Sequence, residues 1–138
     1  MTARLSELGG EEFRRADELL DQAAHDVAKY MALTARNVDP TALSQAEAGY
    51  LLADLCRTDG VRPAWDLWAP FSGELRALAP ADPALETIDR EMAELKKRGT
   101  TPPADRSDLA RLVELTVTVA DRITLLRREV RRRRGAGA

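Results

Sequence analysis

The only histidine in the chain, His25, is the side chain best suited to chemistry. Lys29 follows four residues later, which places both side chains one turn apart on the same face of a helix. An exposed imidazole can accept a phosphoryl group, and a neighbouring ammonium group can stabilise its charge. Asp21 and Glu18, one and two turns before His25, would repel such a group. We favour an ordinary residue on a charged, solvent-facing helix surface, and we keep His25 with Lys29 as an alternative phosphoacceptor site.

The residues around His25 resemble the phosphoacceptor box of the sensor histidine kinases. That box has a histidine, an acidic residue and an apolar residue in succession, and His25, Asp26 and Val27 match it. The sequence departs from the box at Lys29, where that family tends to carry Thr or Asn, and at Tyr30, where it tends to carry Pro. The chain has no glycine-rich ATP-binding boxes. The resemblance therefore implies a degenerate, kinase-like dimerisation bundle and not a complete kinase.

Two other families share part of this pattern. Segment 24–30 is similar to the His-phosphotransfer bundles, which present a histidine with a nearby lysine on a helix; Lys29 lies at i+4, where that family usually has i+3. The same segment resembles the His-Asp doublet of the HD-domain phosphohydrolases, in which an apolar residue and a lysine follow. That family binds its metal through further histidines, whereas this chain has one. We therefore expect no metal site and no cofactor.

Two further groups of residues with reactive side chains, a set of carboxylates and the single cysteine, are better explained by structural roles. Glu86, Asp89, Glu91 and Glu94 lie close together on one expected helix, but a di-iron bundle needs Glu-x-x-His pairs on two helices. We therefore expect a solvated acidic face. Cys56 is the single cysteine, and the sequence does not supply the base and the electropositive, open site that a nucleophilic cysteine needs, so we expect a buried apolar role. A single cysteine cannot form a disulfide within the chain, and we expect a reducing compartment. Without a complete catalytic constellation, we expect a protein that is not an enzyme.

Aromatic residues supply one set of candidate contacts. Trp65, Trp68 and Phe71 are half of the six aromatic residues in the chain. They predict either a ligand pocket or partner-binding hot spot, or a core anchor, which we favour because aromatic side chains dominate small cores. Pro70 lies among them, so we expect a kink there or a division into two short helices.

The C-terminal arginines supply the other set. Residues 127–138 carry six arginines and one glutamate, a local charge of +5, which leaves −7 for the rest of a chain with net charge −2. We favour complementation of the helix dipole and a solubilising end. The alternative is contact with the phosphates of nucleic acid. The candidate contacts are Arg127, Arg128, Arg131 and Arg132.

The helix expected over 109–134 has the clearest pattern in the chain. Its inward positions recur at gaps of three and four, and a second row widens the apolar stripe. At the rise of an α-helix it would be roughly 39 Å long. Other helices must cover this stripe, and we expect self-association because shorter helices could leave part of it exposed. The inward positions are Leu109, Leu112, Thr116, Val119, Ile123, Leu126 and Val130, and the second row is Val113, Val117 and Ala120.

The rest of the chain completes an all-α bundle of about five helices with long first and last members. We expect helices over 11–37 and 39–60, a third segment from Pro63, and a fourth helix from Asp82-Pro83 to Gly99, with Ser107 capping the last. We expect residues 1–10 to be flexible, 11–134 to form one domain and 135–138 to be disordered. The inner face of the first helix is expected at Phe13, Ala16, Leu20, Ala23, Val27, Tyr30 and Thr34, and that of the fourth at Leu85, Ile88, Met92 and Leu95.

Composition limits the functional classes. Apolar residues make up 44% and charged residues 32% of the chain, as is typical of helical globular proteins, and no window is apolar enough to span a membrane. We expect a cytoplasmic, non-enzymatic adaptor or regulatory protein that contacts another protein and can form a homo-oligomer. Two alternatives stay open: a histidine phosphotransfer or kinase-like bundle using His25, and a nucleic-acid accessory protein using the C-terminal arginines.

Overall fold

The computed structural model describes residues 4–36, 62–100 and 104–137, with side chains described as far as Arg132. These residues form helices and no β-strand, which confirms the all-α prediction. The helix expected over 39–60, with Cys56, lies outside the described residues. The elements are η1 (Leu5–Glu7), α1 (Gly10–Ala23), the π-helical turn η2 (Ala24–Ala28), α2 (Lys29–Arg36), α4 (Ala64–Leu78), α5 (Pro83–Gly99) and α6 (Arg106–Gly137).

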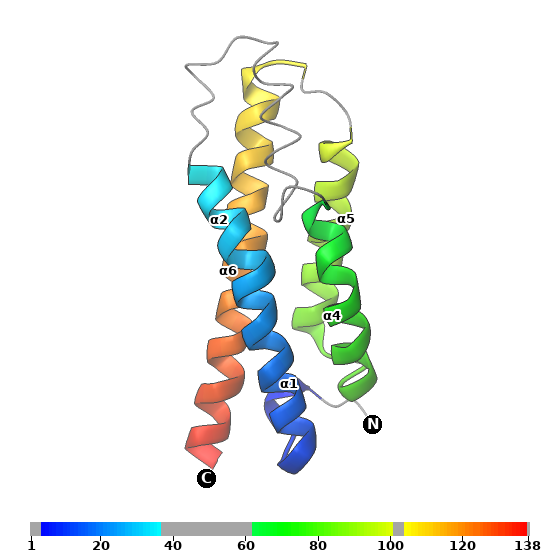
Figure 1. Cartoon of the computed structure of the whole chain (residues 1–138), viewed down its shortest axis with the longest axis vertical. Coiled ribbons are helices and arrows are strands. Elements are labelled where there is room, and N and C mark those ends of the chain that lie inside the picture. The colour runs from blue at the N-terminus through cyan, green and yellow to red at the C-terminus, as the bar shows by residue number, and fades with distance from the viewer. Residues whose placement is uncertain (1–3, 37–61, 101–103, 138) are drawn as a thin grey trace.

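The described helices form an up-and-down bundle (Figure 1). α1, η2 and α2 follow one another without a break, and we call them together the first helix. α6 runs antiparallel to the first helix and contacts both it and α5, while α4 contacts α1 and α5. Four long helices in the described part of the chain therefore surround one core.

The apolar stripe of α6 lies in the centre of this core. All seven inward positions expected from the sequence are buried, which confirms the pattern of three- and four-residue gaps. Of the second row, Ala120 is buried, and Val113 and Val117 pack against the core while partly exposed. The inner face of α5 is also buried as predicted. The chain itself therefore covers the seven inward positions, whereas part of the second row stays exposed, and self-association remains a prediction.

The first helix differs from the predicted regular helix at η2. In η2 the backbone hydrogen bonds span five residues, as the bond from the Lys29 N–H to the Ala24 carbonyl shows. This turn takes up an extra residue and moves the buried face of the following helix by about one position. Met31 and Ala35 are buried, whereas Tyr30 is 48% exposed. The expected inward positions Tyr30 and Thr34 are therefore wrong, because a regular helix of constant period was assumed.

The N-terminal segment contacts the start of α5, and the flexibility expected for residues 1–10 stays a prediction. Leu5 is completely buried, and its backbone N–H donates to Asp82 Oδ2 at 2.7 Å. The other carboxylate oxygen of Asp82 accepts from the Ala84 N–H at 2.8 Å, so this buried side chain caps α5 as predicted and also anchors η1. Burial of the Leu5 side chain and the hydrogen bond of the Leu5 N–H together hold η1 against the start of α5.

One helix end agrees with the expectation and two differ. α5 ends at Gly99 as predicted, and the hydroxyl of its C-cap residue Thr100 donates to the Lys96 carbonyl at 2.9 Å. α6 is capped by Asp105, which accepts from the Asp108 N–H at 2.8 Å, so Ser107 is not the cap. Helix α6 continues to Gly137, so the tail expected to be disordered from 135 is helical as far as that residue.

α4 runs through Pro70 as one helix, so the expected division into two short helices does not occur. Proline lacks the N–H that would bond to the carbonyl four residues earlier, that of Asp66. Both residues are exposed, so water can satisfy this carbonyl. A kink at Pro70 stays a prediction.

Candidate functional site

A groove of about 310 Å³ lies between the first helix and α6, and we call it the His25 groove. It contains both residues of the alternative phosphoacceptor site, His25 and Lys29. The first helix supplies residues from η2 and α2, so the π-helical turn forms part of one wall. π-Helical turns inside α-helices frequently occur at functional sites. The groove is lined by Ala24, His25, Ala28, Lys29, Ala32, Arg36, Ala120, Asp121, Thr124 and Arg127.

His25 is exposed, as the sequence predicted, and its ring has a defined hydrogen bond. Nδ1 lies 2.9 Å from the backbone oxygen of Asp21. A carbonyl oxygen can only accept, so Nδ1 carries the proton in this contact. In the neutral ring, Nε2 then keeps the lone pair. The side chain is 61% exposed, so the groove presents a nucleophilic nitrogen to solvent.

The charged residues of the groove are mostly basic. Lys29, Arg36 and Arg127 are cationic and Asp121 is the one carboxylate of the lining, but Asp21 pairs with Arg127 at 3.0 Å, so the lining together with Asp21 carries a net charge of +1 with His25 neutral. This is opposite in sign to the net charge of the whole chain, −2. Such a lining attracts anionic groups. Helical spacing alone places Arg36 on the same face of the first helix as His25. Asp121 belongs to no motif, and only the packing of α6 on the first helix brings it into this groove.

Two of the candidate arginines bind the first helix. Arg127 Nη1 lies 3.0 Å from Asp21 Oδ1, and its side chain is only 22% exposed. Arg131 Nε lies 2.6 Å from Asp17 Oδ1, and this hydrogen bond raises the pKa of the Arg131 guanidinium above its ordinary value. Arg131 also reaches Asp21, at 3.4 Å. These contacts correct the expectation that the arginines mainly complement the helix dipole.

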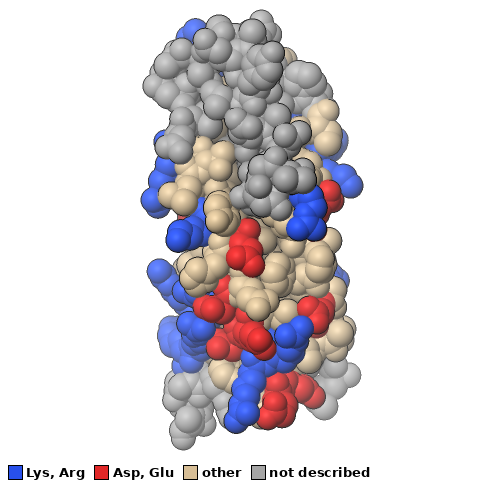
Figure 2. All heavy atoms as spheres, in the orientation of Figure 1, with Lys and Arg blue, Asp and Glu red and all other residues tan. Residues whose placement is uncertain are grey.

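The same contacts bear on the nucleic-acid alternative. Arg127 and Arg131 are engaged by carboxylates of the first helix, whereas Arg128 and Arg132 are exposed. Figure 2 shows Lys and Arg side chains along one edge of the bundle, with Asp and Glu side chains beside them over its lower half. A phosphate backbone approaching this region would therefore meet carboxylates as well as cations, which weakens the attraction.

The aromatic candidates lie mainly in the core. Trp68 is 2% exposed, and its indole N–H donates to Asp89 Oδ1 at 2.7 Å. Trp65 and Phe71 pack against the core while partly exposed. Trp68 is therefore an anchor between α4 and α5, and it does not form part of a surface for a partner.

Asp89 has a role that the sequence did not reveal. We expected it on a solvated acidic face, but its side chain is 25% exposed and accepts hydrogen bonds from three residues of α4. Besides Trp68, these are the Ser72 hydroxyl, at 2.8 Å from both carboxylate oxygens, and Arg76 Nε at 2.6 Å. We call Asp89, Trp68, Ser72 and Arg76 the Asp89 cluster. Its signal in the sequence is the spacing of four between the α4 members, which places them on one face.

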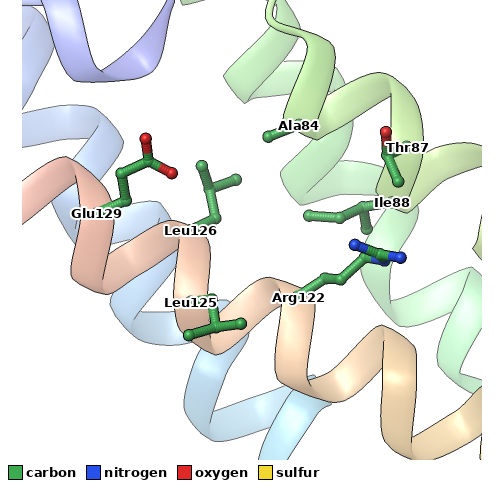
Figure 3. Close-up of a pocket in the computed structure, with 7 residues that line it drawn as sticks. All are labelled: Ala84, Thr87, Ile88, Arg122, Leu125, Leu126 and Glu129. Atoms are coloured by element: carbon green, nitrogen blue, oxygen red, sulfur yellow. The ribbon is translucent and has the colours of Figure 1, made fainter.

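A second, smaller groove of about 180 Å³ lies between α5 and α6, and we call it the Leu125 groove. Figure 3 shows Ile88 of α5 and Leu126 of α6 pointing into the space between the helices, with Arg122 extending towards α5 and Glu129 near the other end. Leu125 also lines this groove and is 57% exposed, the largest value among the exposed large hydrophobic residues of the described part.

No family model, no curated protein and no solved structure matches the chain. Within the described ranges, no group of three or more His, Cys, Asp and Glu side chains is placed to hold a metal ion. None of the helices in these ranges has the combination of length and apolar character needed to cross a membrane. The two grooves are therefore the features of the molecule from which a function can be proposed.

Proposed function

We propose that the protein is a non-enzymatic regulatory module that binds an acidic segment of another protein in the His25 groove. The observation that supports this proposal best is the lining of the groove, in which Lys29, Arg36 and Arg127 outnumber the single carboxylate of Asp121. Arg127 is already held by Asp21 at 3.0 Å, so its guanidinium is positioned before a partner arrives. Preorganised groups lose less entropy on binding.

The expected affinity follows from the exposure of these cations. Lys29 and Arg36 are exposed, and ion pairs at such positions contribute only about 0–1 kcal/mol each. Binding therefore depends on several contacts made together, and it weakens with ionic strength because exposed charges are screened over about 10 Å at 0.1 M salt. A partner segment with several acidic residues in succession fits these requirements better than a single carboxylate does.

A defined probe tests this proposal. We expect a fluorescent oligoglutamate peptide to bind the intact chain, and K29E/R36E to weaken binding by roughly tenfold or more through loss and reversal of two charges. The matched control is R90E/K96E, which reverses two exposed cations of α5. Equal weakening by both double variants would show that the peptide responds only to overall charge, and the proposal would then be wrong.

A second candidate function is phosphoryl acceptance by His25. The observation that favours it is the hydrogen bond from Nδ1 to the Asp21 carbonyl, which leaves the Nε2 lone pair free in the neutral ring. In this step Nε2 forms a bond to the phosphorus of an acyl phosphate. The bond between that phosphorus and the acyl oxygen breaks, and the donor leaves as a carboxylate. No oxidant or reductant takes part.

The surroundings of the ring suit this step in part. Positive charge that develops on the ring during attack lies beside the Asp21 carbonyl, and Asp21 Oδ1 is 4.0 Å from Nδ1. Lys29 and Arg127 line the same groove and can stabilise the negative oxygens of the transferred group. Asp121, also in the lining, opposes them.

Mass spectrometry after incubation with acetyl phosphate tests the second candidate. We expect an acid-labile phosphoryl adduct on the wild-type chain, none on His25→Ala, and slower formation on Lys29→Gln than on the control Lys96→Gln. Because His25 is the only histidine, no other imidazole can take the group. Absence of an adduct on the wild-type chain would remove phosphoryl acceptance and leave the acidic-segment proposal intact.

A further inference from the structure

We propose that the Leu125 groove binds a second copy of this chain, with the two α6 helices crossing antiparallel around a two-fold axis near Leu125 and Leu126. This inference is independent of the His25 groove, which lies between α6 and the first helix. Its starting point is Leu125, a large aliphatic side chain that is 57% exposed beside the partly apolar space between α5 and α6.

The size of the groove suits one aliphatic side chain. Its volume is about 180 Å³, and its apolar lining includes the partly exposed Ala84 and the nearly buried Ile88 and Leu126, which are 1% and 6% exposed. An apolar cavity of about 150 Å³ is large enough to hold benzene. The Leu125 side chain of a second copy can therefore enter the groove, and the two-fold axis places the first copy's Leu125 in the same position on its partner. Each copy then removes an exposed leucine from water.

The two oppositely charged residues that flank Leu125 would pair with each other across this two-fold axis. Arg122 and Glu129 lie two turns apart on one face of α6, at equal distances along the helix from the midpoint of Leu125 and Leu126. In an antiparallel two-fold pair, Arg122 of each copy therefore lies opposite Glu129 of the other. An isologous contact of this kind closes after two copies and does not continue into a filament.

Arg122 already has a partner within the chain, and this contact is compatible with the proposal. It pairs with Glu91 of α5, yet its side chain remains 47% exposed. A guanidinium group has five N–H donors, so it can bind Glu91 and a carboxylate of the second copy together. Glu91 also holds the Arg122 side chain at the end of the groove, which reduces the entropy lost when a second copy binds.

Two-fold symmetry favours a second copy of the chain over an unrelated helix as the occupant of the Leu125 groove. Any amphipathic helix could cover Leu125, but it would also have to supply an acidic residue and a basic residue two turns apart with an apolar residue between them. α6 itself has this arrangement, with Arg122, Leu125 and Glu129 in the required order. Leu125 itself lies outside the seven inward positions of the stripe from which the sequence predicted self-association, and those positions are buried within the chain.

Analytical ultracentrifugation of the full chain over a concentration series tests the interface. We expect a reversible dimer for the wild type, and a dissociation constant raised roughly tenfold or more in Leu125→Asp, because two leucines per dimer lose their apolar contact. The matched control is Leu33→Asp, which changes an aliphatic residue of similar exposure, 44%, on α2. A wild type that stays monomeric at high concentration, or a control that dissociates as readily as Leu125→Asp, would overturn the proposal.

Charge reversal tests the two-fold pairing itself. R122E places two glutamates opposite each other, and E129R places two arginines opposite each other, so each variant alone should dimerise roughly tenfold more weakly. In a mixture of the two variants, both contacts become opposite-charge pairs, and heterodimers should recover most of the wild-type affinity. Circular dichroism melting establishes that both variants are folded. Failure of folded variants to recover affinity on mixing would show that Arg122 and Glu129 do not face each other.

Discussion

The bundle has two polar seams whose carboxylates are similarly exposed but bind different partners. Between α4 and α5, the Asp89 carboxylate is 25% exposed and accepts hydrogen bonds from Trp68, Ser72 and Arg76. Between the first helix and α6, Arg131 meets Asp17 with side chains that are 46% and 29% exposed, beside the open His25 groove. The first seam adds a buried indole and a buried hydroxyl to a carboxylate of similar exposure, whereas the second is formed by charged side chains alone.

We expect the polar groups between α4 and α5 to stabilise the fold, and those between the first helix and α6 to be available for binding. A partly buried carboxylate with several donors contributes to stability because an unmatched group there would be costly. Exposed ion pairs contribute little to stability and leave cations accessible to a ligand. The α4–α5 seam should therefore respond strongly to substitution in unfolding experiments, whereas the seam with the His25 groove should respond mainly in binding experiments.

The largest effect is expected at Trp68. Trp68→Ala removes a fully buried aromatic side chain and should lower the free energy of unfolding by about 3–5 kcal/mol. Trp65→Ala should cost less, because Trp65 is only partly buried. Urea unfolding followed by circular dichroism measures both. If the two variants lose the same stability, Trp68 is not the anchor of the α4–α5 seam.

The next largest effect is expected at Met31, which the π-helical turn places in the core. Met31→Ala should lower the free energy of unfolding by about 2–5 kcal/mol, because Met31 is buried. Tyr30→Ala should change it by about 0.5 kcal/mol or less, because the tyrosine faces solvent. Thermal and urea unfolding of both variants give the comparison. A larger loss for Tyr30→Ala would mean that the first helix is regular and that η2 is absent in solution.

Asp89 should have a smaller but clear effect. Asp89→Ala leaves the Trp68 indole N–H and the Ser72 hydroxyl without their acceptor, which should cost about 1–3 kcal/mol. Glu86→Ala, on the exposed side of the same helix, is the control and should stay within about 0.5 kcal/mol of the wild type. Equal losses in the two variants would make the Asp89 cluster an ordinary surface contact and remove the contrast between the seams.

The smallest effect is expected at the exposed ion pair. Arg131→Ala should lower the free energy of unfolding by about 0–1 kcal/mol at low salt, and by less at 1 M salt, where charges are screened within about 3 Å. Arg132→Ala changes an exposed neighbour and controls for loss of helix propensity. A salt-independent loss above 2 kcal/mol would place Arg131 in the structural class with Asp89.

The sequence alone predicts much of the fold and part of the site. The periodic apolar positions of α6 and α5 follow from local spacing, so all of the inward positions named from the sequence are buried. The cap at Asp82-Pro83 and the exposure of His25 follow from local rules too. Such features depend on residues within one or two turns of each other, which a single helix already determines.

The tertiary structure decided the features that join distant residues. The second bond of Asp82, to Leu5, spans 77 positions, and the contact of Arg127 with Asp21 spans 106. No local sequence pattern predicts such pairs, because each of these residues, taken alone, is an ordinary charged or apolar position. The π-helical turn belongs to this group as well: it places Met31 in the core, and only the demands of packing against α6 distinguish that register from a regular one.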